Sequence, residues 1–80
     1  PKYVDVFSTS VSSVITEDGS KYIFKIQNEE IVKKIPIEVV SRYKNRYIIQ
    51  GDIKINDLIV SRDVASLANG QKVKIKMSND

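Results

Sequence analysis

The sequence contains no cysteine, no histidine and no tryptophan. Without cysteine there is no disulfide framework, no thiolate nucleophile and no zinc cluster of the usual kind. Without histidine there is no serine–histidine catalysis and no histidine metal site. None of the three glycines precedes a lysine–serine pair, which excludes a phosphate-cradling loop. We therefore predict a protein that is not an enzyme and that has no catalytic residue, no metal and no cofactor.

Length and charge describe one small domain that covers residues 1–80. Of the 80 residues, 41% are hydrophobic and 29% are charged, which supports a single thin core. The net charge of +3 is a mild bias that keeps a small protein in solution without demanding an acidic partner. No apolar run approaches the roughly 18 residues of a membrane span. The chain begins at Pro1 and not at methionine, so we expect a fragment of a longer chain, in which residues 1–13 are a strand of this domain or of a neighbouring segment.

Alternation of apolar and polar residues, which is typical of half-buried β-strands, runs through the chain. Residues 21–26 place Tyr22, Phe24 and Ile26 on one face, and Pro36 excludes a helix through residues 30–40. The expected strands are residues 3–7, 11–15, 21–26, 30–40, 46–50, 58–62 and 72–77. Strands at intervals of about ten residues favour an all-β fold, a small antiparallel roll or barrel of six or seven short strands.

Turn residues separate these strands, and one segment has a helical pattern. Residues of the types that tolerate tight turns predict turns at Asp18, Gly19, Gly51, Asp52, Asn56, Asp57, Asn69 and Gly70, with further turns at Asn28-Glu29 and Lys44-Asn45. Asp63–Ala68 is the expected short helical turn. Asp63 is its expected cap, and Val64 and Leu67 share its buried face.

Three groups of polar residues are candidates for chemistry, and each has a simpler structural explanation. The acidic pairs Glu17-Asp18 and Glu29-Glu30 lie in expected turns, where we interpret them as solvated hairpin tips. Residues 52–57 resemble a calcium loop but lack two of its oxygen ligands, so we reject that site. Serines 8, 10, 12 and 13 stand in no nucleophile motif, and solvent-facing strand positions explain them, although a serine–lysine pair elsewhere stays open.

The stretch with a binding character is Arg42, Tyr43, Lys44, Asn45 and Arg46, followed by Tyr47. Interleaved basic and aromatic side chains are compatible with three interpretations. They form a solvated hairpin turn, a nucleic-acid site in which Tyr43 and Tyr47 stack on bases, or a contact with another protein. Acidic residues elsewhere in the chain dilute the basic field. We favour a protein contact through Arg42–Arg46, because arginine and tyrosine are preferred anchors of protein interfaces.

The order of motifs along residues 14–77 is similar to that of a known family. It reads Val14-Ile15, Glu17-Asp18-Gly19, Lys21–Ile26, Ile31–Ile37, Tyr47–Val60 and Leu67–Ile75. This order resembles the C-terminal membrane-proximal domain of periplasmic adaptor subunits (membrane fusion proteins) of tripartite efflux pumps. The chain departs from the family pattern at Asp52-Ile53 and Asn56-Asp57, where the family often has glycine, and in lacking a proline around residues 11–13.

The resemblance implies a non-catalytic adaptor module of an efflux transport system. Such adaptors bridge an inner-membrane transporter to an outer-membrane channel, and their membrane-proximal domain docks on the periplasmic part of the transporter. The implied partners are therefore the inner-membrane efflux transporter and other adaptor subunits, with the outer-membrane channel contacted by domains outside this chain. The implied location is the periplasm, with anchoring to the inner membrane through parts not present here. The alternative function is a small β-barrel that binds nucleic acid.

Overall fold

The computed structural model describes residues 5–28 and 30–74. It is built from antiparallel strands, with single turns of 3-10 helix as its helical elements in these ranges. The elements are β1 (Phe7–Ser10), η1 (Val11–Ser13), β2 (Ile15–Glu17), β3 (Ser20–Gln27), β4 (Ile31–Tyr43), β5 (Arg46–Gly51), β6 (Leu58–Ile59) and η2 (Val64–Ser66). The predicted all-β class with a short helical turn is confirmed. No helix in the described ranges is long and apolar enough to cross a membrane.

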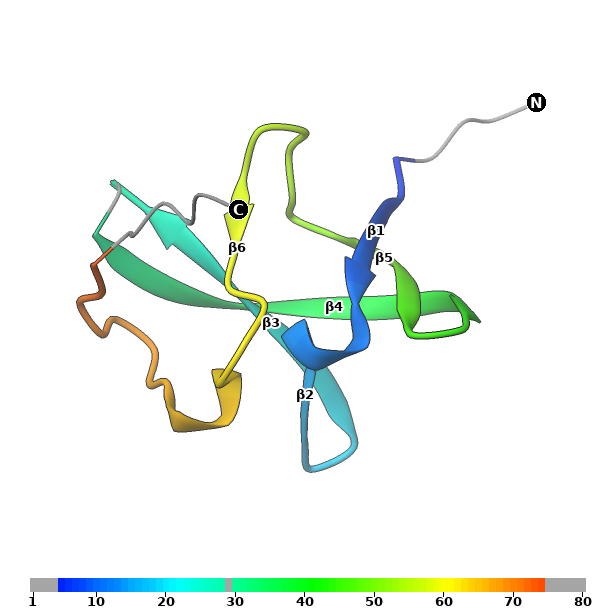
Figure 1. Cartoon of the computed structure of the whole chain (residues 1–80), viewed down its shortest axis with the longest axis horizontal. Coiled ribbons are helices and arrows are strands. Elements are labelled where there is room, and N and C mark those ends of the chain that lie inside the picture. Colours follow the sequence, from blue (N-terminus) through cyan, green and yellow to red (C-terminus); the bar gives the residue numbers. More distant parts are fainter. Residues whose placement is uncertain (1–4, 29, 75–80) are drawn as a thin grey trace, which may run out of the picture.

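The strands form a roll because the N-terminal segment pairs with both ends of the sheet (Figure 1). The sheet order is β1-β5-β4-β3-β2, and β6 pairs with β3. β1 lies along β5, with Phe7 opposite Ile49, whereas β2 lies along β3, with Ile15 opposite Tyr22. Residues 7–17 are therefore one bent segment of two strands, β1 and β2, joined by η1, and this segment closes the β3-β4-β5 meander.

A pair of buried hydroxyl groups forms the bend in this segment. Residues 11–15 do not form the single strand that we predicted, because Val11–Ser13 is a 3-10 turn. Ser13 is completely buried, and its hydroxyl donates to the carbonyl oxygen of Ser10 at 2.7 Å and lies 2.6 Å from the Thr9 hydroxyl. The prediction that these serines face solvent is wrong for Ser13, because its hydroxyl supplies the hydrogen bonds that a buried corner needs.

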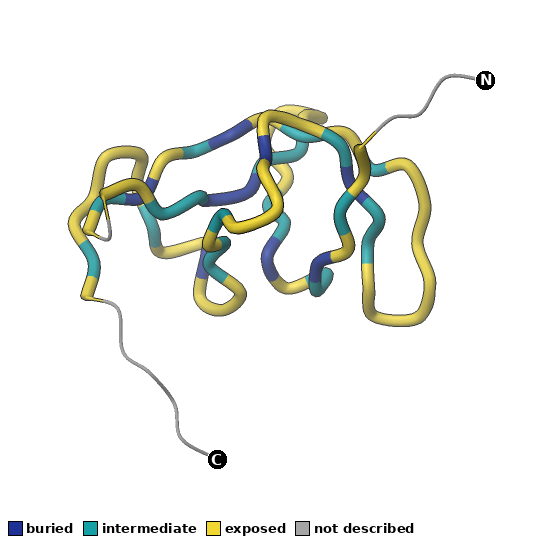
Figure 2. The backbone as a smooth tube through the Cα atoms, turned by 90° about the horizontal axis from the view of Figure 1, so that it is seen from above, coloured by how far each residue is buried: buried dark blue, intermediate teal, exposed yellow. Residues whose placement is uncertain are grey.

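Strand β3 lies between two apolar clusters, because successive residues of a strand point to opposite faces. The face predicted for burial packs Phe24 with Val32 and Val64. The opposite face is buried as well, since Ile23 packs with Ile35, Ile49 and Ile53. Most of the buried residues therefore lie on the strands, whereas Ser13, Ile53 and Val64 are buried outside them, and the exposed backbone lies mainly at the turns (Figure 2). A sheet with apolar side chains on both faces gives this short chain two small clusters in place of one core.

The C-terminal third contains less regular structure than the alternation indicated. The strand predicted at residues 58–62 is reduced to the two residues of β6, and Leu58 is 52% exposed. The helical turn spans Val64–Ser66, and Asp63 takes a left-handed φ of 56° without capping it through its side chain. Of the strand predicted at 72–77, Lys72 bridges to Ile31. Residues 75–77, residues 3–4 of the first predicted strand and Glu29 lie outside the described residues.

We expect Ser13→Ala to lower the free energy of unfolding by about 1–3 kcal/mol, because it leaves the partly buried Ser10 carbonyl and the buried Thr9 hydroxyl without their partner. Urea denaturation followed by far-UV circular dichroism measures the loss. The matched control is Ser20→Ala, at an exposed position, for which we expect a change within about 0.5 kcal/mol. Equal stabilities of the two variants would contradict the role of the buried corner.

Candidate functional site

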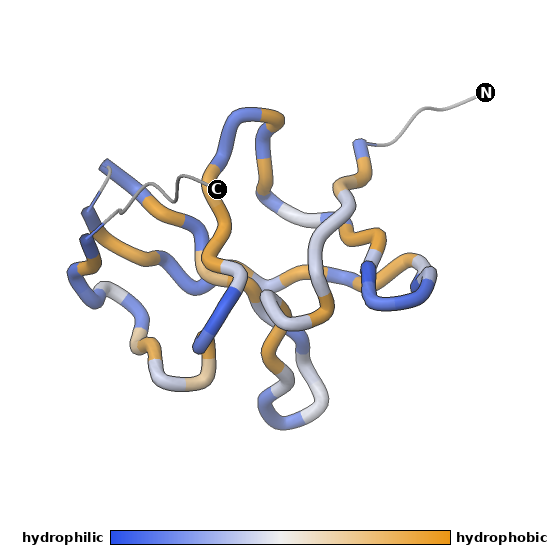
Figure 3. The backbone as a smooth tube through the Cα atoms, viewed as in Figure 1, coloured by the Kyte–Doolittle hydropathy of each residue, from blue (hydrophilic) through white to orange (hydrophobic). Residues whose placement is uncertain are grey.

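The candidate site is the hairpin tip, by which we mean the five residues Arg42–Arg46. The tip joins β4 to β5 through the two-residue turn Lys44-Asn45, and Lys44 takes a left-handed φ of 55°. All five residues are exposed, and Tyr43 is 68% exposed. The hairpin extends to the right of the roll in Figure 1, and the turn is strongly hydrophilic in Figure 3.

A β-bulge in β4 decides which way the side chains of the hairpin tip face. Val39 lies opposite the buried Ile49, but the register then shifts by one residue at Val40, which is 54% exposed. Beyond the shift, Arg42 is opposite Tyr47 and Tyr43 is opposite Arg46. Because neighbours in a strand alternate, Arg42 and Tyr47 share one face of the hairpin, and Tyr43 and Arg46 share the other.

Local contacts orient two of the three cations of the hairpin tip. The Nε–H of Arg42 donates to the carbonyl oxygen of Lys44 at 3.0 Å, and its guanidinium carbon lies 5.5 Å from the centre of the Tyr47 ring. The Nζ of Lys44 lies 5.4 Å from the centre of the Tyr43 ring. Both contacts fall within the range of cation–π attraction, which holds the side chains without neutralising their charge.

The third cation anchors the hairpin tip to the bent N-terminal segment. The Nε–H of Arg46 donates to the hydroxyl of Ser8 on β1 at 3.1 Å. The backbone N–H of Val11, in η1, donates to the carbonyl oxygen of Asn45 at 3.0 Å. The same segment that closes the roll therefore braces one side of the tip and fixes its direction.

The cations of the hairpin tip form no ion pair within the described ranges. The salt bridges found there lie elsewhere in the roll and are Lys25–Asp57, Lys34–Glu17 and Lys72–Glu30. Positive charge that neighbouring carboxylates do not balance is available to an anionic partner. The predicted binding residues Arg42, Lys44 and Arg46 are thus brought together at one exposed point.

No protein-family model matches the chain, and no curated protein sequence matches it either. The resemblance to the adaptor domain therefore stays a prediction from the order of the sequence motifs. The function of this chain has to be argued from its geometry.

The other sequence-predicted turn residues shape the roll. Asp18 and Gly19, both with positive φ, form the β2–β3 turn, and the N–H of Gly70 donates to the carbonyl oxygen of Val32. Asn69 accepts the N–H of Lys34 through its side chain. Gly51 ends β5, and a Cβ there would lie 2.9 Å from the Cγ2 of Ile37, so this position requires glycine for close packing and not for a left-handed turn.

The carboxylate of Asp57 fixes the conformation of the loop that contains the predicted turns at Asp52 and Asn56-Asp57. The N–H of Lys54 donates to Asp57 Oδ2 at 2.7 Å, and the N–H of Asp57 donates back to the Lys54 carbonyl. The Nζ of Lys25 lies 3.4 Å from the same oxygen and donates to the carbonyl of Asp52. The hydrogen bond from Lys54, assisted by the charge of Lys25, holds the pKa of Asp57 below its usual value. The loop presents Ile55 at its apex with 88% exposure, which sequence reasoning did not identify.

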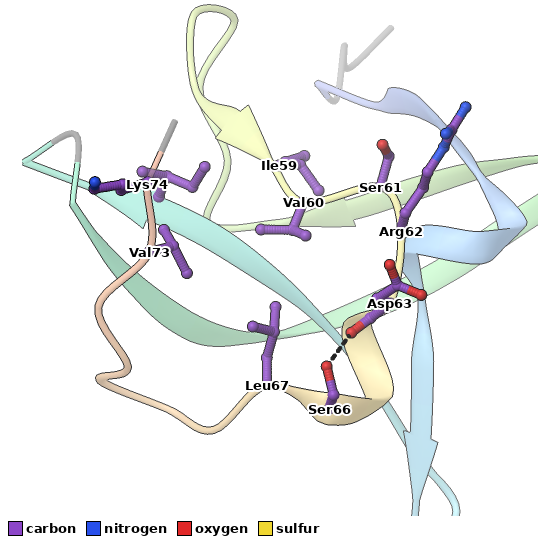
Figure 4. A pocket seen from close by; sticks show the side chains of 10 residues that line it. Ile59, Val60, Ser61, Arg62, Asp63, Ser66, Leu67, Val73 and Lys74 are labelled. Carbon is purple, nitrogen blue, oxygen red and sulfur yellow. Dashed lines mark hydrogen bonds between the residues drawn. The ribbon is translucent and has the colours of Figure 1, made fainter. Parts of the chain in front are cut away.

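Two open hollows accompany these turns. One, of about 380 Å³, is lined by Val60, Leu67 and Val73, with Lys74 at the opposite end from Ser61 and Ser66 (Figure 4). The Ser66 hydroxyl donates to the carbonyl of Asp63, and within this hollow both Ser61 and Ser66 lie away from Lys74 (Figure 4). The other, of about 340 Å³, lies beside Val6, Ile53 and Ile55. Residues 5–28 and 30–74 contain no group of three or more potential metal ligands.

We expect Asp57→Asn to destabilise the protein at neutral pH and to have less effect in acid. A lowered folded-state pKa contributes stability that is fully present above the unfolded value of about 3.9 and is lost as the pH falls through the folded value. Urea midpoints of the wild type and the variant, measured from about pH 7 to about pH 2, should therefore converge. A gap between them that stays constant over this range would show that the charge of Asp57 does not stabilise the loop.

Proposed function

We propose that this chain is a non-catalytic docking module that binds a partner protein through the hairpin tip. The observation that carries the proposal is the gathering of three unpaired cations and an exposed tyrosine on a braced, projecting hairpin within the described part of the chain. Arginine and tyrosine provide much of the binding energy at protein interfaces once water is excluded. The placement of these residue types on the hairpin tip supports the proposed docking function.

Pre-organisation strengthens the argument for docking. Arg42 is held by a backbone carbonyl and a ring, and Arg46 is held by the Ser8 hydroxyl, so less side-chain entropy is lost when a partner binds. The two-residue turn and the bond between Val11 and Asn45 fix the backbone in the same way. A tip held in this manner presents the same shape before and after binding.

The sequence resemblance suggests which partner this module serves. We propose that it acts in the periplasm as the membrane-proximal module of an adaptor, docking on the periplasmic part of an inner-membrane efflux transporter. Other adaptor subunits are neighbouring partners, and the outer-membrane channel is contacted through domains outside this chain. The role requires no catalysis and no cofactor, only a roll that presents a turn at a fixed position.

The alternative of a nucleic-acid-binding barrel receives less support from the geometry. Stacking of bases requires aromatic rings that share one accessible surface. Tyr43 and Tyr47 lie on opposite faces of the hairpin, and each ring has its own cation. This arrangement therefore favours a protein contact over base stacking on Tyr43 and Tyr47.

The double variant Arg42→Glu with Arg46→Glu tests the proposal. We expect it to bind the purified periplasmic region of the efflux transporter from the same genome at least about tenfold more weakly, because two interface arginines are reversed in charge. Biolayer interferometry with the immobilised transporter region measures the affinity.

The matched control is Lys33→Glu with Arg62→Glu, which changes the net charge equally at two exposed cations outside the hairpin tip. This control should retain the affinity of the wild type. If the tip variant also retains that affinity, the hairpin tip is not the docking surface. Thermal melts of both variants establish that each remains folded.

A further inference from the structure

We infer that the hairpin tip binds inside a recess of the partner protein whose opposing walls both carry carboxylates. This inference rests on the proposed docking function and specifies the surface that the tip recognises. It follows from the placement of the three cations around the hairpin, which differs from the placement that a flat contact requires.

The cations of the hairpin tip point in different directions. Arg42 lies on the face that it shares with Tyr47, and Arg46 lies on the opposite face, where it contacts Ser8. Lys44 stands at the apex between them. The two strands of a hairpin lie only about 4.8 Å apart, so the two arginines are separated mainly by the thickness of one sheet layer.

A flat partner surface would contact one face of the hairpin and leave the other in water. Ion pairs that remain exposed to water add little to affinity. Walls on both sides of the hairpin would desolvate Arg42 and Arg46 together, and each guanidinium would meet a carboxylate in its favoured planar geometry. The two-sided placement of charge therefore fits a recess better than a plane.

The edge of the hairpin is unfavourable for another common mode of recognition, the addition of a strand from another chain. β3 pairs with β4 as far as Ile37, so beyond it the outer edge of β4 has no partner strand in the described ranges. The bulge at Val40 interrupts this edge, and a bulge hinders the addition of a strand from another chain. The structure therefore favours recognition of the side chains of the hairpin tip in a recess of the partner over the addition of a partner strand to the edge of β4.

Carboxylates fit this site better than phosphates do. A lipid headgroup layer is a plane and meets the same objection as a flat protein. A duplex groove has phosphates on both walls, but three contacts release few counterions, corresponding to a salt slope of only about −2.7. Binding in an acidic recess of a protein requires no more than three charge contacts, because tight packing supplies the remaining affinity. The hairpin tip provides these contacts through Arg42, Lys44 and Arg46.

Single substitutions on the two faces test the inference. Against the same periplasmic transporter region, we expect Arg42→Glu alone and Arg46→Glu alone each to weaken binding at least about tenfold, because each removes the contact with one wall. Lys33→Glu is the control for the change of charge and should bind as the wild type does. Arg46→Gln should bind more tightly than Arg46→Glu, because only the glutamate repels an acidic wall.

The outcomes separate this inference from the proposed function. If only one of the two single glutamate variants loses affinity, the partner surface is flat, and docking through the tip survives while the recess is overturned. Equal affinities of Arg46→Gln and Arg46→Glu would overturn the acidic character of the wall. If neither single variant nor their combination loses affinity, the proposed function itself is wrong. Binding of duplex DNA at low salt, abolished by either single glutamate substitution, would replace the acidic recess with a nucleic-acid groove.

Discussion

The hydrogen bonds of the buried Ser13 hydroxyl are the interactions on which the rest of this structure depends. A chain of 80 residues has little apolar surface to bury, and a sheet that ends in two open edges would bury even less. The hydrogen bonds that join the Ser13 hydroxyl to the Ser10 carbonyl, to which it donates, and to the Thr9 hydroxyl turn the N-terminal segment out of its pairing with β5 and into its pairing with β3. Three polar groups that satisfy one another thus close the roll, in a chain that has no cysteine for a disulfide.

The same closure positions the candidate site. When the segment bends at η1, the N–H of Val11 reaches the carbonyl of Asn45, and Ser8 lies beneath Arg46. The hairpin tip projects from the roll, yet one of its strands is held by β1 along four residue pairs. A projecting hairpin without such a brace would lose entropy on binding, whereas this one is ordered by the contacts that form the fold. The corner and the tip are therefore parts of one arrangement, although Ser13 and Arg42 are 29 positions apart in the sequence.

The sequence predicted the structure correctly where a residue type suits only one environment, and wrongly where the type suits both solvent and the interior. Alternation around Phe24 and Ile49 identified strands correctly, because apolar side chains at those positions have no solvated alternative. Ser13 was misjudged because a hydroxyl is equally suited to solvent and to a buried bond, and only the three-dimensional path decides. The bulge at Val40 left no signal, since one extra valine in a β-branched run looks like more strand. The basic and aromatic composition of the hairpin tip was visible, but the face of each side chain was not.

The bulge in β4 determines both how charge is distributed over the hairpin tip and how regular the exposed edge of β4 is. With strict alternation from Val39, Tyr43 would join Tyr47 on the inner face, and the tip would have an aromatic side and a cationic side. The inserted residue places one tyrosine and one arginine on each face. It also disrupts the exposed edge of β4, which would otherwise offer a regular row of backbone groups to any strand. The residue that disrupts strand pairing at this edge is thus the residue that distributes the positive charge around the hairpin. Selectivity against other strands and the proposed complementarity to an acidic recess therefore have a single structural origin.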